Sequence, residues 1–308
     1  MRSSGTILCL GSAAAFGAMA VFGKLAYADG ATVGTLLAVR FVLAAALLWT
    51  LVLAGGAARE IRALGGRDIG IALALGGGCY AAQAGCYFAA LERIDASLLS
   101  LVLYTFPVMV AVAAIALGRE RLNGRRLAAL GLASGGLGLV VAGAGTGALD
   151  PLGIALALGA AVVYSAYILS SEGVARRMRP GTLSALVCTG AAAILTVGSA
   201  LLGELRPGEL TITGWGWLAC VAVVSTVASI TLFFAGLRRV GPTTASILAT
   251  VEPLVTVLLA FLVFGEVLSA VQLAGGALVL GGVLVLYVRW PRSRQARQPI
   301  RVATEEAI

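Results

Sequence analysis

Long apolar runs separated by short polar breaks constrain this sequence more than any other feature. The hydrocarbon core of a bilayer is about 30 Å thick, so a helix needs roughly 20 apolar residues to cross it. Ten such runs follow one another: residues 5–27, 32–54, 68–91, 95–117, 126–144, 152–172, 182–203, 214–236, 243–264 and 269–289. A spanning backbone must satisfy its own hydrogen bonds, and the alternating pattern of a lipid-facing barrel is absent. We therefore predict an all-α polytopic membrane protein with ten transmembrane helices.

The composition excludes several classes of protein. Hydrophobic residues make up 60% of the chain and charged residues 12%, whereas soluble domains are about a quarter charged. There is no His, and only 14 residues are Asp or Glu, which leaves few groups for acid–base catalysis and no imidazole for a metal. The five Cys residues lie in apolar runs without a C-x-x-C pair. We expect no enzymatic activity, no metal site and no cofactor.

The Lys and Arg residues predict the orientation of the chain. With ten spans, both termini and the even-numbered connections lie on one side of the membrane. Eighteen of the 22 Lys and Arg residues fall on that side, Arg40 lies within a span, and the other side holds Lys24, Arg93 and Arg206. Because basic loops remain in the cytoplasm, we expect cytoplasmic termini and a location in the bacterial cytoplasmic (inner) membrane. This bias explains the net charge of +8, so no nucleic-acid partner is needed.

The two halves of the chain resemble each other. Residues 91–141 align with residues 237–287 at a constant offset of 146, and 12 of the 51 positions are identical. The matches include Pro107 with Pro253, Glu120 with Glu266, and Gly135-Gly136 with Gly281-Gly282. Five helices is an odd number, so the second half must enter the membrane inverted, with a site near the midplane. We predict helices 1–5 in residues 1–146, helices 6–10 in residues 147–290, a central cavity between them, and a cytoplasmic polar tail in residues 291–308.

Two matching segments carry a resemblance to a known family. They run from Phe106-Pro107 through Gly118-Arg119-Glu120-Arg121-Leu122, and from Glu252-Pro253 through Phe264-Gly265-Glu266-Val267-Leu268. Each precedes a glycine-rich helix, and the pair resembles the signature of the drug/metabolite transporter superfamily, EamA type. Leu37-Ala38-Val39-Arg40-Phe41 also fits it. The resemblance implies a ten-helix exporter of small metabolites, often amino acids, and the chain is similar in size and polar content to the bacterial amino-acid exporters of this family, including those for aromatic amino acids.

Three charged residues in or near the predicted spans are candidate functional groups. Glu252 is the only acid deep within a span, and ionisable groups at that depth are expensive and commonly functional. It is a candidate proton site or contact for a substrate ammonium group, and the structural alternative is an ion pair with Arg40 or Lys24. For Arg40 we favour a structural pairing role over contact with a substrate carboxylate. Lys24 is predicted to lie at the external interface, near the cavity mouth.

Aromatic and polar side chains that share helix faces are the candidate cavity lining. Tyr80, Gln83 and Tyr87 share one face of helix 3, and Tyr164 and Tyr167 share one face of helix 6. Further candidates are Ser100 and Tyr104 on helix 4 and Ser229 on helix 8. Rings with a few hydrogen-bond donors suit a zwitterion with an apolar side chain. The structural alternative is hydrogen bonding between helices.

The proline and glycine positions predict bending and packing. Pro107 and Pro253 are candidate bending points, because proline removes a backbone hydrogen bond. Glu252 lies about 200° around helix 9 from Thr250, so both face one cavity only if Pro253 distorts that helix. The small-residue faces Gly131–Gly135 and Ala277–Gly281 are predicted to allow close helix packing, either within the protomer or in a dimer.

We interpret the sequence as a transporter that exports amino acids, aromatic or other neutral ones, or related small metabolites, by alternating access. The alternatives are a passive channel or facilitator, a multidrug exporter of the same fold, and an integral-membrane protein without transport activity. No phosphate-binding motif supports ATP-driven pumping. The expected partners are a small-molecule substrate and the lipid bilayer, with proton coupling left open, and we expect a monomer rather than a dimer.

Overall fold

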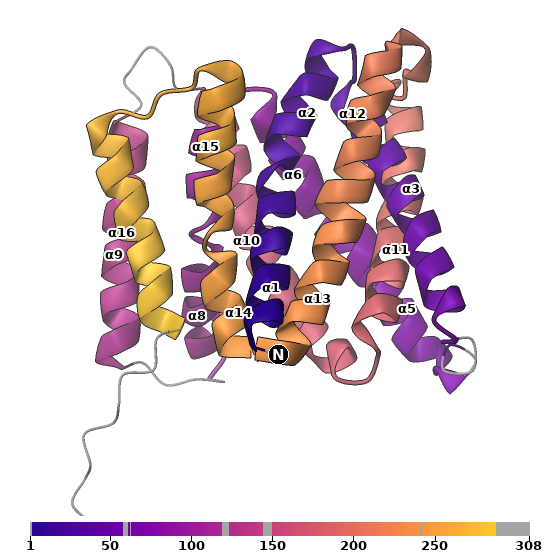
Figure 1. Ribbon diagram of the computed structural model, residues 1–308, viewed down its shortest axis with the longest axis horizontal. Coiled ribbons are helices and arrows are strands. Elements are labelled where there is room, and N and C mark those ends of the chain that lie inside the picture. Colours follow the sequence, from indigo (N-terminus) through magenta and orange to yellow (C-terminus); the bar gives the residue numbers. More distant parts are fainter. Residues whose placement is uncertain are drawn as a thin grey trace, which may run out of the picture.

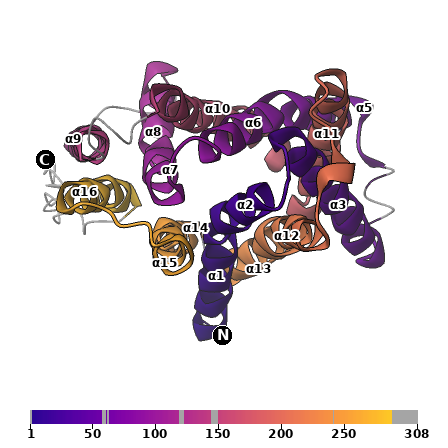
Figure 2. The ribbon, with the colours of Figure 1, turned by 90° about the horizontal axis from the view of Figure 1, so that it is seen from above.

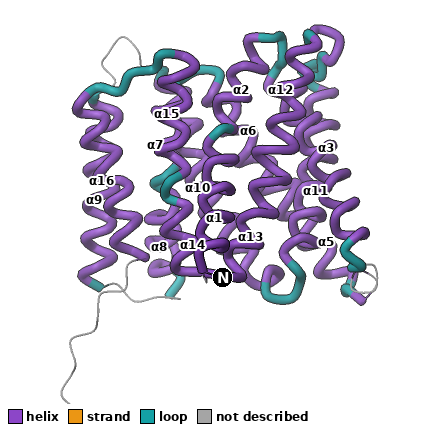
Figure 3. The backbone as a smooth tube through the Cα atoms, in the orientation of Figure 1, coloured by secondary structure: helices purple, strands orange, loops and turns teal. Residues whose placement is uncertain are grey.

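The computed structural model describes residues 2–57, 61, 63–118, 123–143, 150–240 and 242–287, and within these ranges it contains helices and no strands (Figure 3). The α-helices are α1 (Arg2–Gly17), α2 (Met19–Ala28), α3 (Val33–Ala54), α5 (Gly66–Ala74), α6 (Ala81–Leu91), α7 (Ala96–Leu103), α8 (Phe106–Ala116), α9 (Gly124–Ala142), α10 (Pro151–Ala175), α11 (Pro180–Leu201), α12 (Ile212–Ala222), α13 (Ser229–Val240), α14 (Pro242–Ala249), α15 (Glu252–Phe264) and α16 (Ala270–Tyr287). Short π-helical segments, Leu75–Tyr80 and Val223–Ala228, join α5 to α6 and α12 to α13, and a 3₁₀ turn covers Pro207–Glu209. The predicted tail at residues 291–308 lies outside the described residues.

The helices are those of an integral membrane protein. Among the described residues, eight helical segments are long and apolar enough to cross a bilayer. The apolar helices α15 and α16 are shorter and occupy the ninth and tenth predicted spans. Exposed side chains such as Leu258 and Phe261 on α15 are large and apolar, as a surface that faces lipid requires. The all-helical polytopic class predicted from the sequence is therefore present.

The helices run between two faces of the molecule (Figure 1). The face where α1 begins and where α13 and α16 end is called the N-terminal face below. The face where α2 and α15 end and α12 begins is called the opposite face (Figure 1). Glu266, which follows α15, therefore lies on the opposite face. Its sequence counterpart Glu120 lies outside the described residues.

Four pairings dominate the helix packing. α9 packs against α16 and α3 against α11, while α1 packs against α13 and α10 against α6. Seen from above, α9 and α16 lie side by side at one end of the molecule (Figure 2). α9 and α16 run antiparallel, because Ser269 Oγ donates to the carbonyl of Gly143 at one end and Arg125 donates to the carbonyl of Leu286 at the other. Each of these pairs joins one helix from each half of the chain.

Among the described residues five of the spans are interrupted, and four of the interruptions come in pairs. The first span breaks at Ala18 between α1 and α2, whereas α10, in the sixth span, is continuous. The fourth span breaks at Tyr104–Thr105 between α7 and α8, and the ninth at Thr250–Val251 between α14 and α15. Pro107 and Pro253 stand in the first turn of α8 and α15, where the missing N–H is harmless and the fixed φ suits a helix start. Each break thus precedes its proline. The third and eighth spans contain the two π-helical segments, which the sequence analysis did not predict.

The close packing of α9 on α16 uses different glycines from those predicted. A methyl group added to Gly136 would lie 2.6 Å from the carbonyl oxygen of Gly275, and one added to Gly282 would lie 2.9 Å from that of Ala129. At Gly131 and Gly135 the same addition would meet nothing within 4 Å. For packing within the protomer the predicted face was therefore wrong by one residue: the backbones approach at Gly136 and Gly282, and not at Gly131 and Gly135.

Adjacent glycines on α9 provide a matched test of this contact. Gly136→Ala should destabilise the protein by about 1–3 kcal/mol, because the methyl group overlaps the backbone of α16. Gly135→Ala should be neutral or slightly stabilising, since alanine is about 0.5–1 kcal/mol better than glycine inside a helix. Thermal unfolding of the two variants in detergent measures the difference. Equal shifts in midpoint would contradict the packing described here.

Candidate functional site

A cavity of about 380 Å³ lies between helices contributed by both halves of the chain. Its lining includes nine of the residues singled out in the sequence: Arg40, Tyr80, Gln83, Tyr87, Tyr104, Pro107, Tyr164, Tyr167 and Glu252. Four others do not line it. Ser100 and Ser229 are buried elsewhere between helices, Pro253 is buried in the first turn of α15, and Lys24 lies nearer the opposite face.

The cavity is displaced toward the N-terminal face. Its lining reaches Cys9 in the middle of α1, Ser184 in the second turn of α11, and Phe233 and Phe234 in the middle of α13. Toward the opposite face the lining ends short of Lys24 and Glu266. The described structure therefore holds its cavity on the N-terminal side of a closed opposite face.

Sequence reasoning missed several lining residues. Phe16, Met19, Phe106 and Cys188 are apolar or weakly polar residues within apolar spans, so nothing in their pattern separated them from lipid-facing neighbours. In a regular helix Thr250 and Glu252 would face different directions, yet both residues line the cavity. The break at Thr250–Val251 explains this, because it uncouples the directions of the two side chains.

Aromatic rings form a continuous wall through the site. Tyr80 contacts Phe41 at a centroid distance of 5.5 Å and Tyr167 at 5.4 Å. From Tyr167 the series continues through Tyr164 at 6.2 Å, Phe106 at 4.6 Å and Tyr104 at 5.7 Å. Offset and edge-to-face pairs of this kind are mutually stabilising. The wall has the cation of Arg40 at one end, over the Phe41 ring, and the carboxyl group of Glu252 at the other.

Glu252 begins α15 directly after the helix break. The Tyr104 hydroxyl donates to the Ala249 carbonyl at 2.6 Å and to Glu252 Oε2 at 3.1 Å. One hydroxyl proton thus serves two acceptors, and a proton on Glu252 would complete the second hydrogen bond. The ion pair with Arg40 or Lys24 considered from the sequence is not formed by the described residues, because each of those cations has other contacts.

Arg40 is held by a hydroxyl group and two rings. Only 3% of the residue is exposed. Its Nε donates to Thr226 Oγ1 at 3.0 Å, and its guanidinium lies 4.7 Å from the Phe41 centroid and 5.3 Å from that of Phe88. Thr226 in turn donates to the carbonyl of Val221, five residues earlier, at 2.9 Å. The π-helical segment Val223–Ala228 therefore carries the hydroxyl that orients Arg40.

Lys24 and Glu266 close the opposite face. Lys24 Nζ donates to Glu266 Oε1 at 2.7 Å and lies 3.6 Å from Asp95. The Glu266 carboxylate also accepts hydrogen bonds from the N–H of Ala96, the N–H of Ser97 and the Ser97 hydroxyl, at 3.1, 3.0 and 2.8 Å. Its side chain is 8% exposed and that of Lys24 22%. One carboxylate thus joins α2, the start of α7 and the α15–α16 connection.

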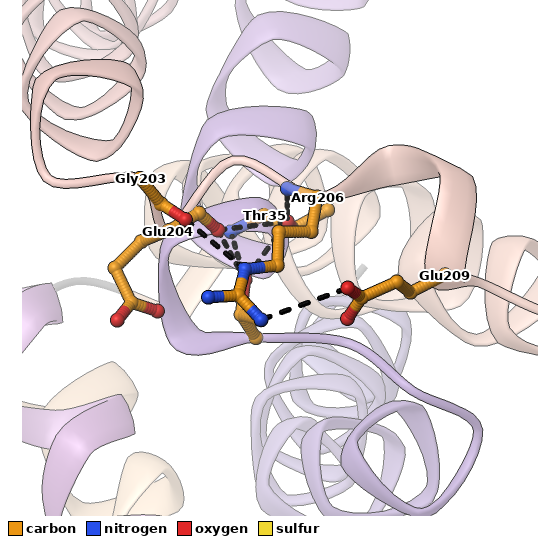
Figure 4. Close-up of polar contacts among 6 residues, drawn as sticks. Thr35, Gly203, Glu204, Arg206 and Glu209 are labelled. Carbon is orange, nitrogen blue, oxygen red and sulfur yellow. Dashed lines mark hydrogen bonds and ion pairs between the residues drawn. The ribbon is translucent and has the colours of Figure 1, made fainter.

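Further polar contacts tie the opposite face together. Figure 4 shows Thr35 of α3 between the backbone of Glu204, to which its hydroxyl donates at 3.1 Å, and the N–H of Arg206, from which it accepts at 2.8 Å. The carboxylate of Glu204 points away from Arg206 (Figure 4). Trp217 of α12 donates to Asp29, after α2, at 3.0 Å. Each contact crosses from one half of the chain to the other.

Comparison with known proteins supports transport as the activity of this fold. A sequence model of the EamA-like transporter family matches residues 3–142 and again residues 151–288. The chain belongs to the EamA-like transporter family. This family member is 30% identical over 201 residues to an uncharacterized transporter of Archaeoglobus fulgidus, covering 65% of this chain and 70% of that protein. It is 25% identical over 279 residues to the uncharacterized transporter YcbK of Bacillus subtilis, covering 89% of both chains.

A solved crystal structure shares the fold of this EamA-like transporter. The match has a TM-score of 0.63 and 20% sequence identity, and covers 92% of this chain and 98% of the other. At that identity the likeness shows the fold alone. Together with the family matches, it makes the protein an integral-membrane transporter.

The closure at Glu266 predicts a pH dependence of stability. Burial alone would raise the pKa of Glu266, but the hydrogen bonds from Lys24 and Ser97 outweigh it and hold that pKa below its ordinary value. A carboxyl group whose pKa falls on folding contributes its stability above the unfolded pKa of about 4.3 and loses it as the pH falls through the lower folded value. The wild-type unfolding temperature in detergent should therefore drop below about pH 4.3.

Glu266→Ala should lower the unfolding temperature at neutral pH, because one partner of a largely buried pair is lost. It should also reduce the fall of the unfolding temperature at acid pH, because the titrating carboxyl group is gone. Glu204→Gln is the matched control, since Glu204 lies on the same face and its carboxylate is exposed and points away from Arg206 (Figure 4). An equal fall of the unfolding temperature at acid pH in wild type and Glu266→Ala would contradict the role given to Glu266.

Proposed function

We propose that the protein exports amino acids, aromatic or other neutral ones, or closely related zwitterions, by alternating access. The observation that carries this proposal is the cavity itself: a guanidinium and a carboxyl group stand apart on a shared aromatic wall. A zwitterion with an apolar side chain offers a carboxylate to the first, an ammonium to the second and a hydrophobic surface to the rings. Membership of the EamA-like transporter family is consistent with this cargo.

The proposed architecture is two inverted five-helix repeats, residues 1–146 and 147–290. The contacts between α9 and α16 support it, because the sequence offset of 146 exchanges them: Gly136 meets Gly275, and Gly282 meets Ala129. The helix breaks at Tyr104 and Thr250 differ by the same 146 residues. The two π-helical segments both have six residues, and they lie in the third and eighth predicted spans. The family model matches each half separately.

The proposed mechanism is a rocking of the two halves that exposes the cavity to each side in turn. The described conformation would be the one that faces the N-terminal side. By the distribution of basic residues, that side is the cytoplasm of a bacterial inner membrane. The breaks before Pro107 and Pro253 are the proposed bending points. We propose that the cluster of Lys24, Glu266 and Ser97 must open when the protein turns outward.

The closed opposite face also bears on the rival functions. A passive channel needs a continuous path, and the cavity lining ends before the Lys24–Glu266 pair on the opposite face. A multidrug exporter for cations would gain nothing from a buried guanidinium in its cavity, since like charges repel. These observations favour a carrier for zwitterions over both alternatives.

Transport by purified protein in liposomes tests the proposed function. A panel of radiolabelled amino acids, with phenylalanine, tyrosine and leucine in it, should show saturable uptake or exchange that protein-free liposomes lack. Aromatic or large apolar members should be preferred over glycine because they cover more of the aromatic wall. Absence of uptake and exchange for every member of the panel would rule out amino acids as cargo.

Glu252→Gln tests proton coupling at the same site. The amide keeps the shape of the carboxyl group but cannot gain or lose a proton, so net transport should stop responding to an imposed pH gradient while exchange of substrate continues. Glu172→Gln is the control, since Glu172 lies on the surface in a pair with Arg176. If the variant retains the pH response of the wild type, Glu252 is not the coupling group.

A further inference from the structure

We infer that Arg40 is the binding site for the substrate's carboxylate at the closed end of the cavity. The inference rests on the proposed function and specifies one part of it: which residue selects the substrate, and by which chemical group. It also replaces the structural pairing role that the sequence favoured for Arg40.

The first argument is an incomplete set of hydrogen bonds. A guanidinium has five N–H donors. Among the described residues, Thr226 alone accepts one of them, through Nε. The remaining four donors, on the two Nη atoms, have no protein acceptor in the described part of the chain. No carboxylate there lies within ion-pair distance of Arg40, although the residue is 97% buried. Unpaired buried charges are costly, so such a group calls for an anionic partner.

The second argument is how the guanidinium is presented. Arg40 lines the cavity, and its plane is supported by the rings of Phe41 and Phe88. Thr226 fixes Nε, which leaves the two Nη atoms as the free edge of the fork. A carboxylate matches that fork with two parallel hydrogen bonds. Because the rings and Thr226 hold the side chain in place before the ligand arrives, little side-chain entropy is lost on binding.

The third argument is position. Arg40 is the only Lys or Arg among the described residues that line the cavity, so it sets where an anionic group can bind there. Phe88 connects this site to the closed face, because its carbonyl accepts a hydrogen bond from Tyr27 of α2 at 2.9 Å. A substrate carboxylate on Arg40 thus occupies the end of the cavity that must open on the other side.

The test compares substrates that differ only at the carboxylate. Binding of an accepted amino acid and of its primary amide is measured on detergent-purified protein by titration calorimetry, for wild type, Arg40→Lys and Arg40→Gln. Wild type should prefer the acid by roughly 10- to 100-fold, the value of hydrogen bonds to a charged group. Arg40→Gln should bring the ratio of acid to amide close to one. Arg40→Lys should be intermediate, because it keeps the charge and loses the fork.

The readout is the ratio of the affinity for the acid to the affinity for the amide. A general loss of structure lowers both affinities together and leaves this ratio unchanged. Arg176→Gln, at an exposed surface pair, is the matched control and should keep the wild-type ratio. An unchanged ratio in both Arg40 variants would overturn the inference while the proposed function stands. If Arg40→Gln does not purify as a folded protein, Arg40→Lys decides the question. An acid-to-amide affinity ratio in Arg40→Lys equal to that of the wild type would then overturn the inference. Wild-type protein that binds none of the amino acids would instead reject the proposed function.

Discussion

The bilayer's lack of water is the constraint on which the rest of this structure depends. A spanning segment has no solvent to satisfy an open N–H or carbonyl group, so an interruption survives only where protein or a hydrated cavity replaces the lost partner. The breaks at Tyr104–Thr105 and Thr250–Val251 are both at the cavity, since Tyr104 and Thr250 line it. Tyr104 compensates one of them directly, through its hydrogen bond to the Ala249 carbonyl. Departures from regular helix are thus concentrated around the proposed substrate site.

The buried charges follow from the same constraint, and they are treated in two ways. Glu266 is saturated: a lysine, two backbone N–H groups and a hydroxyl surround its carboxylate. Arg40 and Glu252 are only partly satisfied, by one hydroxyl each, and both face the cavity. A saturated charge holds a structure together, whereas an unsaturated one has capacity left for a ligand. This difference separates the closure at the opposite face from the proposed site.

The sequence predicts the class of this protein well because hydropathy and length follow directly from the membrane. It also identifies most of the polar side chains of the cavity lining, since residues such as Tyr80, Gln83 and Tyr87 are unusual in an apolar span unless a polar environment lies beside them. It fails where a backbone departs from regular helix. The π-helical segment Val223–Ala228 has no distinctive composition, and the three glycines within Leu75–Tyr80 do not by themselves specify a π-helix. Without knowledge of the break at Thr250–Val251, the direction of Glu252 could not be derived from helical spacing. The partner of Lys24 was also beyond reach, because Glu266 is 242 residues away.

The repeat bears on how each face of the protein would close. At the offset of 146, Glu266 corresponds to Glu120 and Ser97 to Thr243, so the sequence retains an acid and a hydroxyl for an equivalent closure on the N-terminal side. Lys24 has no such equivalent, since the sixth predicted span contains neither Lys nor Arg. A carboxylate with a nearby ammonium is held more strongly than one with hydroxyl and backbone donors alone. Under the proposed mechanism, the sixth span therefore offers no counterpart of Lys24 to an N-terminal closure, and the two closures would differ in their chemistry.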